Sequence, residues 1–141
     1  MKIVLDTNCL IQIVTGRGYK YNVWMAFLKQ DYTLCYTTEI LCEYEEVMMH
    51  FYKDVEFAKA VINVILASPN TEQVDPSYRF RLIADDPDDN KFVDCAITCG
   101  ATYIVSDDKH FDVLRSIPFP ETNVQKLREF ARMLSNKRIN A

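Results

Sequence analysis

The sequence predicts an α/β fold in which a central, mainly parallel sheet of roughly four to five strands lies between layers of helices. Short apolar runs with β-branched residues, such as residues 2–5 and 101–105, are typical of buried strands. The segments between these runs place apolar residues at helical spacing, so strands and helices alternate along the chain. Such alternation favours parallel strands joined by helices that cover both faces of the sheet.

Length and composition predict one domain that spans residues 1–141. Hydrophobic residues make up 49% and charged residues 26%, which is usual for a soluble globular protein. No apolar run is long enough to span a membrane, and the start MKIVLDTN is too short for a signal peptide. We therefore expect a cytoplasmic protein without a membrane association.

The five cysteines are an odd number without a Cys-x-x-Cys pair, so reduced thiols packed as small apolar side chains are expected. His50 and His110 lack the spacing of zinc ligands. The net charge of −4 argues against nucleic acid at first sight. If four of the acids share a metal site, however, 16 acidic residues remain against 16 basic ones. Charge thus neither supports nor excludes a nucleic-acid partner.

The first part of the chain is predicted to hold two strands and two short helices. In chain order these are a strand at 2–5, a helix start at 9–14, a helix at about 22–29 and a strand at 33–36. A longer helix follows, which Thr37 or Thr38 can cap. Its apolar stripe comprises Ile40, Tyr44, Val47, Met48 and Phe51. Glu43 belongs to this stripe, whereas Glu46, one turn away, points elsewhere.

The second part continues the alternation of helices and strands. Asp54 can cap a helix that ends at Ala67 and whose stripe includes Leu66. A weak edge strand is predicted at 71–74, the stretch 75–84 stays unassigned, and a helix opened by Asp89 and a strand at 101–105 follow. A short helix around 113–114 and an edge strand at 117–120 come next. Thr122 or Asn123 caps a last helix that runs to about 134, and residues 136–141 are expected to fray.

The stretch DDPDDNKFVDCAITCGATYIVSDDKHF, residues 85–111, carries two acidic clusters. Asp89 lies on the apolar stripe of the helix that it opens, where a carboxylate is costly unless something neutralises it. Asp107 and Asp108 follow the strand at 101–105. Because ligands of open α/β sheets bind outside the carboxyl ends of strands, two acidic clusters delivered there indicate a divalent cation.

Four acids are therefore candidate metal ligands: Asp6, Glu43, Asp89 and Asp108. If they converge, their repulsion raises their pKa values or cations hold them together. Mg²⁺ or Mn²⁺ suits oxygen ligands, and such ions can activate water for phosphodiester hydrolysis. Taken singly, each acid has another explanation: a helix cap for Asp6 or Asp108, an ion pair for Glu43, and a solvated turn for 85–89. Their placement at successive element ends favours a shared site.

Four motifs together resemble the PIN-domain ribonucleases, in particular the VapC-like toxins of bacterial toxin–antitoxin systems. They are Ile3-Val4-Leu5-Asp6-Thr7-Asn8, Glu43 within residues 41–47, Asp86-Pro87-Asp88-Asp89-Asn90-Lys91-Phe92, and residues 100–108. The last motif resembles a PIN subgroup assigned to toxin components. The similarity covers almost the whole chain and rests on the order and spacing of motifs that are weak singly.

The resemblance implies a PIN-like three-layer α/β/α fold and a Mg²⁺- or Mn²⁺-dependent endoribonuclease that is the toxin of a toxin–antitoxin pair. It makes the four acids the metal-binding and catalytic residues, with an RNA substrate, a cognate antitoxin and a homodimer as partners. Thr7, Asn8 and Ser106 match polar positions that support the metal ligands, and so does Asp94, although helical spacing puts it off the apolar stripe. Asp107 stands where a glycine is frequent.

Basic residues outside the acidic motifs are candidates for guiding RNA: Arg17, Lys20, Arg79, Arg81, Lys126, Arg128, Arg132, Lys137 and Arg138. The C-terminal group among them could equally be a solvated helix face. Salt-dependent binding is the property that separates the two interpretations.

Other functions remain open at this stage. A PIN nuclease that processes RNA without being a toxin, or a non-catalytic PIN-like scaffold, would carry similar motifs. A haloacid-dehalogenase-type phosphatase would need an acid at position 8, where Asn8 stands. A receiver domain would need an acidic pair near the end of its first strand, where Asp6 stands alone.

Overall fold

The computed structural model describes the backbone of residues 1–140 and the side chains of residues 1–137. Its five strands form one sheet in which every neighbouring pair is parallel, with the order β3-β2-β1-β4-β5. The strands are β1 (Lys2–Leu5), β2 (Thr33–Tyr36), β3 (Thr71–Gln73), β4 (Tyr103–Val105) and β5 (Val124–Gln125). The predicted parallel sheet between helices is therefore confirmed.

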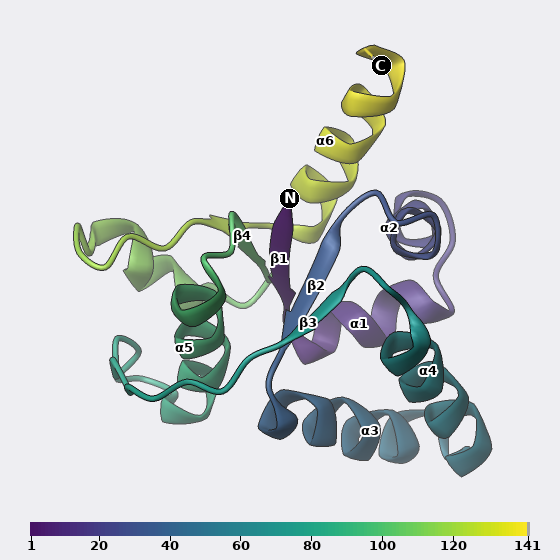
Figure 1. The fold of residues 1–141 in the computed structure, drawn as a ribbon, viewed down its shortest axis with the longest axis horizontal. Coiled ribbons are helices and arrows are strands. Elements are labelled where there is room, and N and C mark those ends of the chain that lie inside the picture. The colour runs from purple at the N-terminus through teal and green to yellow at the C-terminus, as the bar shows by residue number, and fades with distance from the viewer. Residues whose placement is uncertain (141) are drawn as a thin grey trace.

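Six α-helices and two short 3₁₀ segments complete the described chain. They are α1 (Thr7–Val14), α2 (Tyr19–Leu28), α3 (Thr38–Tyr52), α4 (Val55–Ala67), η1 (Pro87–Asp89), α5 (Asn90–Cys99), η2 (Lys109–Ser116) and α6 (Leu127–Asn140). Helix α5 packs across β1, β2 and β4 on one side of the sheet, while α1, α2 and α4 lie on the other side (Figure 1). Three layers result.

Strand β1 is the centre of the sheet and sets where the later chemistry is placed. It pairs with β2 on one side and with β4 on the other, with Leu5 opposite Val105. The residues of β1 from Ile3 to Leu5 are almost completely buried. Because the strands are parallel, all their carboxyl ends reach the same edge of the sheet, from which α1, α3 and η2 begin.

The predicted helix starts and stops are largely present. Thr37 Oγ1 accepts a hydrogen bond from the Ile40 amide (3.1 Å), and Asp54 Oδ1 accepts one from the Phe57 amide (3.0 Å). Both side chains thereby satisfy an amide that the first turn of a helix leaves free. Gly100 ends α5 in the left-handed conformation (φ 69°), which glycine adopts without steric cost.

Three predicted elements differ from the structure. Residues 117–120 form no strand, because Pro118 and Pro120 lack the amide that a ladder needs, and the edge of the sheet is completed by β5 instead. The last helix therefore begins at Leu127, and it continues to Asn140 through the segment expected to fray; Ala141 lies outside the described residues. Helix α2 starts earlier than expected, at Tyr19, after the turn at Gly18.

Two predicted core positions are exposed. Phe51, in the last turn of α3, is 66% exposed because it faces an open pocket beside Ile11 and Val47. Leu66 is also exposed, since α4 packs on α3 through a narrower stripe than predicted. All five cysteines are free, and four of them are buried, as expected. None of the helices described is long and apolar enough to cross a membrane.

A buried tyrosine hydroxyl joins α3 to the end of β1. Tyr44 is fully buried and donates a hydrogen bond to the carbonyl oxygen of Leu5, the residue that precedes Asp6. We predict that Tyr44→Phe lowers the free energy of unfolding by about 1–3 kcal/mol, because the carbonyl is left without this partner. Urea denaturation measures the change. Tyr78→Phe, which alters a 65% exposed residue, is the control, and equal effects of both substitutions would contradict the prediction.

Candidate functional site

The ends of β1 and β4 bring the first two predicted acids together. The Asp6 amide donates to the Val105 carbonyl at 3.0 Å, which carries the strand register one residue past β1. Ser106 Oγ then donates to Asp6 Oδ2 at 2.7 Å and accepts from the Asp108 amide at 3.0 Å. One serine hydroxyl thus links the two acidic motifs, which are about 100 residues apart in the sequence.

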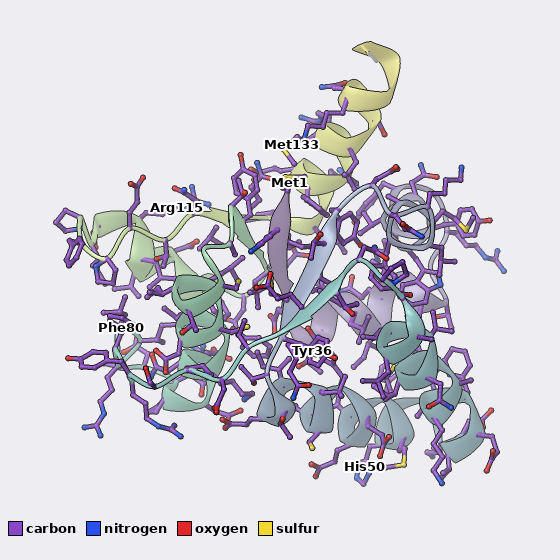
Figure 2. All side chains as sticks on the ribbon, in the orientation of Figure 1. Met1, Tyr36, His50, Phe80, Arg115 and Met133 are labelled. Atoms are coloured by element: carbon purple, nitrogen blue, oxygen red, sulfur yellow. The ribbon has the colours of Figure 1, made fainter. Side chains whose placement is uncertain are left out.

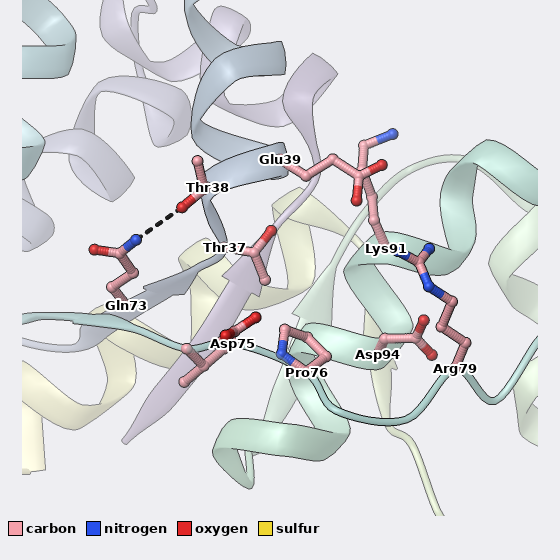
Figure 3. Close-up of a pocket in the computed structure, with 10 residues that line it drawn as sticks. Thr37, Thr38, Glu39, Gln73, Asp75, Pro76, Arg79, Lys91 and Asp94 are labelled. Atoms are coloured by element: carbon pink, nitrogen blue, oxygen red, sulfur yellow. Dashed lines mark hydrogen bonds between the residues drawn. The ribbon is translucent and has the colours of Figure 1, made fainter.

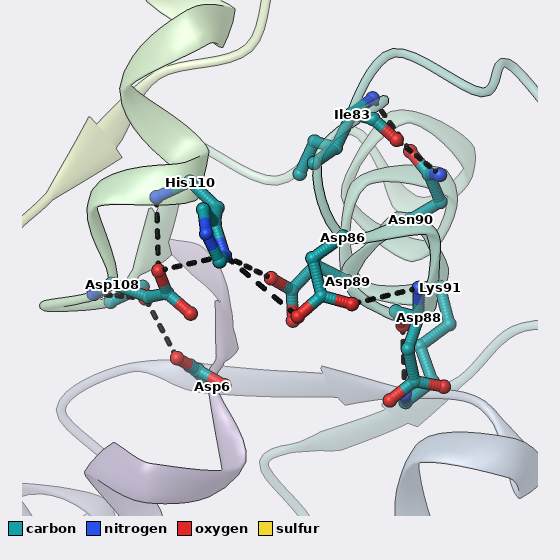
Figure 4. A network of polar contacts seen from close by, with 10 residues as sticks. Asp6, Ile83, Asp86, Asp88, Asp89, Asn90, Lys91, Asp108 and His110 are labelled. Carbon is teal, nitrogen blue, oxygen red and sulfur yellow. Dashed lines mark hydrogen bonds and ion pairs between the residues drawn. The ribbon is translucent and has the colours of Figure 1, made fainter.

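Asp89 reaches the same place from the start of α5. Its Oδ2 lies 3.6 Å from His110 Nδ1, which is also 3.3 Å from Asp108 Oδ1 and 3.7 Å from Asp86 Oδ2 (Figure 4). The backbone amide of His110 donates to Asp108 Oδ1 at 2.9 Å, so Asp108 also caps η2. The imidazole therefore lies between three carboxylates: Asp86, which precedes η1, Asp89, which ends η1, and Asp108, which follows β4.

Glu43 approaches from α3 and is held by two partners. Thr7 Oγ1 donates to Glu43 Oε2, and the Lys91 ammonium lies 2.9 Å from Glu43 Oε1. The same ammonium lies 2.9 Å from Asp88 Oδ2 and donates to the Asp88 carbonyl. Because the Lys91 side chain is only 5% exposed, its charge is compensated mainly by these two acids.

Two of the acids, Asp6 and Asp89, have raised pKa values. Burial raises the pKa of Asp6, the hydrogen bond from Ser106 opposes this rise, and the charges of Asp108 and Glu43 add to it. Burial also raises the pKa of Asp89, to about 6, together with the charges of Asp86, Asp108 and Asp6. His110 acts in the opposite direction on Asp89. Like charges held out of water disfavour ionisation, so the arrangement is costly without a cation.

The arrangement fits a divalent cation. Asp89 Oδ2 and His110 Nδ1 are sealed from solvent and make no hydrogen bond to the described residues. One ligand atom each from Asp86, Asp89 and His110 lie within 4.8 Å of one another. A buried polar atom without a partner is unusual in a folded protein and calls for an explanation, such as an ion. The donors are mainly carboxylate oxygens, which are the ligands that Mg²⁺ and Mn²⁺ take.

The profile of the PIN domain matches residues 2–110, which is most of the chain. This chain belongs to the PIN-domain family. The match begins at β1 and ends at His110, so it includes all four predicted acids.

A solved structure supports the PIN fold independently. One of seven chains of known structure that match belongs to the crystal structure of VapBC2 from Rickettsia felis bound to a DNA fragment from their promoter. The two chains are 20% identical, with a TM-score of 0.60, and the similarity covers 89% of this chain and 98% of the other. At this identity the likeness shows a shared fold. No curated protein sequence matches at a significant level.

The residues expected to support the acids of this PIN domain fall into two groups. Thr7 and Ser106 contact Glu43 and Asp6 directly, as described above. Asn8 is exposed and lines a pocket of about 440 Å³ that also borders Asp6, Asp108 and the exposed Phe51. This pocket opens on Asp6 and Asp108, whereas neither Glu43 nor Asp89 lines it.

Asp94 and Asp107 have structural contacts that the sequence did not reveal. Helical spacing puts Asp94 off the apolar stripe of α5, yet Asp94 is only 6% exposed because the 75–84 loop contacts this side of the helix. Its Oδ1 accepts from the Phe80 amide at 3.0 Å, so it anchors the 75–84 loop, on which helical spacing carries no information. Asp107 Oδ1 accepts from the Leu127 amide at 2.9 Å and caps α6.

Sequence reasoning missed three residues of the site: Asp86, Lys91 and His110. The spacing in the sequence addresses His110 only as a zinc ligand, whereas the structure places its Nδ1 beside Asp86, Asp89 and Asp108. The available signal was its position two residues after Asp108, where a short turn folds a side chain back. Lys91 gave no comparable signal, because at about 100° per residue it lies about 200° around the helix from Asp89 and therefore off the apolar stripe.

Basic residues of the 75–84 loop line two pockets that they share with Lys91 and Asp94. Arg79, Lys91 and Asp94 line one pocket of about 530 Å³ (Figure 3). Arg79 and Arg81 also line a neighbouring pocket of about 470 Å³ with Lys91 and Asp88. Among the C-terminal candidates, Arg128 lies over the Tyr19 ring at 5.0 Å, and the side chain of Arg138 lies outside the described residues.

The raised pKa of Asp89 makes a prediction about stability without metal. A carboxyl group whose pKa is about 6 in the folded state and 3.8 otherwise favours folding less as pH rises from about 4 to 6. In a chelator, Asp89→Asn should therefore raise the free energy of unfolding at pH 8 by at least about 1 kcal/mol, and change it little at pH 4. Urea denaturation at both pH values measures this.

The control is Asp75→Asn, which removes an exposed carboxylate from the loop and should have no such pH dependence. Asp89→Asn that destabilises the protein at pH 8 would mean that the ionised carboxylate has a stabilising partner even without metal.

Proposed function

We propose that this PIN domain is a metal-dependent endoribonuclease that hydrolyses RNA phosphodiester bonds. The observation that carries the proposal is the gathering of four acids, Asp6, Glu43, Asp89 and Asp108, from separate elements at one edge of a parallel sheet. Further support comes from the membership of the PIN family and from the unpartnered atoms between the acids.

In this proposal the four acids hold Mg²⁺ or Mn²⁺ and do not attack the substrate themselves. When bound, the cation supplies an activated water and offsets negative charge on the phosphate. Ser106 keeps Asp6 and Asp108 in register through its hydroxyl, and Thr7 orients Glu43. Lys91 balances the charge of Glu43 and keeps its carboxylate from swinging away.

We predict that Asp6→Asn reduces RNA cleavage by at least about 10²-fold, comparable with the loss of one group that stabilises the transition state. The substitution keeps shape and removes a charged ligand, so the fold should survive. Cleavage of a mixed RNA pool is measured with Mg²⁺ or Mn²⁺, with and without chelator. Activity that survives both the chelator and Asp6→Asn would belong to a contaminant or to another mechanism.

Two glutamates of α3 provide a matched pair for the same assay. Glu43→Gln should lose activity as Asp6→Asn does, because Glu43 is tied to Thr7 and Lys91 beside the other acids. Glu46→Gln alters an exposed residue one turn away and should leave activity unchanged. The reverse result would assign the metal-binding role to Glu46.

RNA binding should depend on the basic border of the site. Arg79 and Arg81 are exposed and line the pocket next to Lys91, so a phosphate backbone that reaches the acids would pass them. We predict that the double variant Arg79→Ala, Arg81→Ala weakens RNA binding and reduces its dependence on salt by about one to two released counterions. Lys59→Ala and Arg115→Ala, both at exposed positions that line neither of these pockets, form the control. Binding that ignores ionic strength would exclude this role.

We further propose that the nuclease is the toxin of a toxin–antitoxin pair and acts in the cytoplasm as a homodimer of single-domain chains spanning 1–141. The similarity to a chain of VapBC2 from Rickettsia felis supports this role. Expression of the wild type should arrest growth, expression of Asp6→Asn should not, and a small DNA-binding protein encoded next to the gene should restore growth and bind the toxin. Ribonuclease activity without growth arrest would instead indicate an RNA-processing enzyme.

A further inference from the structure

His110 Nδ1 is surrounded by carboxylates but bonded to none of them. Its three neighbours, Asp108 Oδ1, Asp89 Oδ2 and Asp86 Oδ2, lie at 3.3, 3.6 and 3.7 Å. A protonated imidazole that paired with one of these acids would form a shorter hydrogen bond, of about 2.7–2.9 Å. The spacing is instead that of ligand atoms arranged around a common point.

Two of these four atoms make no hydrogen bond to any described residue. Asp89 Oδ2 and His110 Nδ1 are inaccessible to solvent and lack a hydrogen-bond partner among the described residues. Asp89 as a whole is only 9% exposed, so water does not serve it either. Asp86 Oδ1 caps η1 by accepting from the Asp88 amide, which leaves its Oδ2 turned toward the histidine (Figure 4). The caps on η1 and η2 thus hold Asp86 and Asp108 in place around His110.

We propose that His110, Asp86 and Asp89 bind a transition-metal cation, with His110 Nδ1 as a nitrogen ligand, so that this site prefers Mn²⁺ to Mg²⁺. The inference rests on the proposed function, because Asp89 belongs also to the four acids assigned there. It extends that function by adding two ligands and by choosing between the two metals. Imidazole suits first-row transition metals, whereas Mg²⁺ takes oxygen ligands almost exclusively.

The chain offers an unusually clean spectroscopic test because it contains two histidines. The second, His50, is exposed on α3 at the edge of the molecule (Figure 2). Untagged protein is labelled with ¹⁵N-histidine and loaded with Mn²⁺ alone, and pulsed electron paramagnetic resonance detects nitrogen bound to the ion. We expect a directly coupled ¹⁵N in the wild type and in His50→Ala, where His110 is the remaining histidine, and its loss in His110→Ala.

Competition with Mg²⁺ gives a second readout on the same samples. Removal of the nitrogen ligand should lower the affinity for Mn²⁺ by at least about tenfold while changing that for Mg²⁺ less. His50→Ala should keep the wild-type preference. These measurements require no RNA and no activity, and the His50→Ala protein alone decides the ligand if His110→Ala does not fold.

The outcomes separate the two proposals. Bound Mn²⁺ without nitrogen coupling overturns the histidine ligand and leaves the four-acid nuclease standing. Nitrogen coupling that persists in His110→Ala or disappears in His50→Ala overturns the assignment to His110. Failure of the wild type to bind Mn²⁺ overturns the histidine site, and failure to bind either Mn²⁺ or Mg²⁺ overturns both proposals.

Discussion

Repulsion between buried carboxylates is the constraint around which this site is built. Asp6 and Asp89 are both almost completely buried, and this burial, together with the charges of neighbouring acids, raises both of their pKa values. A protein gains nothing for its stability from such an arrangement, since each ionised group would be better placed in water. The gathered carboxylates therefore destabilise the folded state, and a bound cation can offset this cost. The rest of the structure holds the acids together against their repulsion.

Several neutral or cationic groups share that task. Ser106 donates to Asp6 and accepts from the backbone of Asp108, so it spaces the two acids without adding charge. Lys91 compensates Glu43 and Asp88 from within α5. The two sides differ: Glu43 has an ammonium at salt-bridge distance, whereas Asp89 has an imidazole just beyond hydrogen-bond distance. The negative charge around Asp89 is thus less compensated than that of Glu43, and a cation would be most favourable beside Asp89.

The site is also connected to the outer elements of the fold. Asp107 caps α6, and Asp94 and Asn90 hold the backbone of the 75–84 loop at Phe80 and Ile83. Both contacts start from elements that carry acids of the site, namely the end of β4 and helix α5. Positions of Arg79 and Arg81 relative to the acids therefore depend on the same helix that positions Asp89. Under the proposed function, α5 would therefore couple the binding of the metal to the binding of the RNA.

The sequence by itself determined the alternation of strands and helices, the caps Thr37 and Asp54, and the placement of Asp6 and Asp108 after strands. These features follow from local rules: apolar periodicity, capping chemistry and the common direction of parallel strands. The sequence also singled out Glu43 and Asp89 as carboxylates on faces that should be buried. Local patterns could not assign residues 117–125. The prolines there permit an edge strand without requiring one, and the strand that does form, β5, depends on its pairing with β4.

Only the tertiary structure decided which groups meet. Several contacts of the site join segments whose relative position depends on packing. They are the ion pair of Glu43 with Lys91, the approach of His110 to Asp86 and Asp89, and the hydrogen bond between Asp94 and the 75–84 loop. Periodicity places a side chain on a face of its own helix, but says nothing about which irregular segment crosses that face. The burial of Asp94 is an example, since it comes from a loop without any repeating pattern. The position of His110 is another, since it depends on a short turn that the Asp108 carboxylate caps.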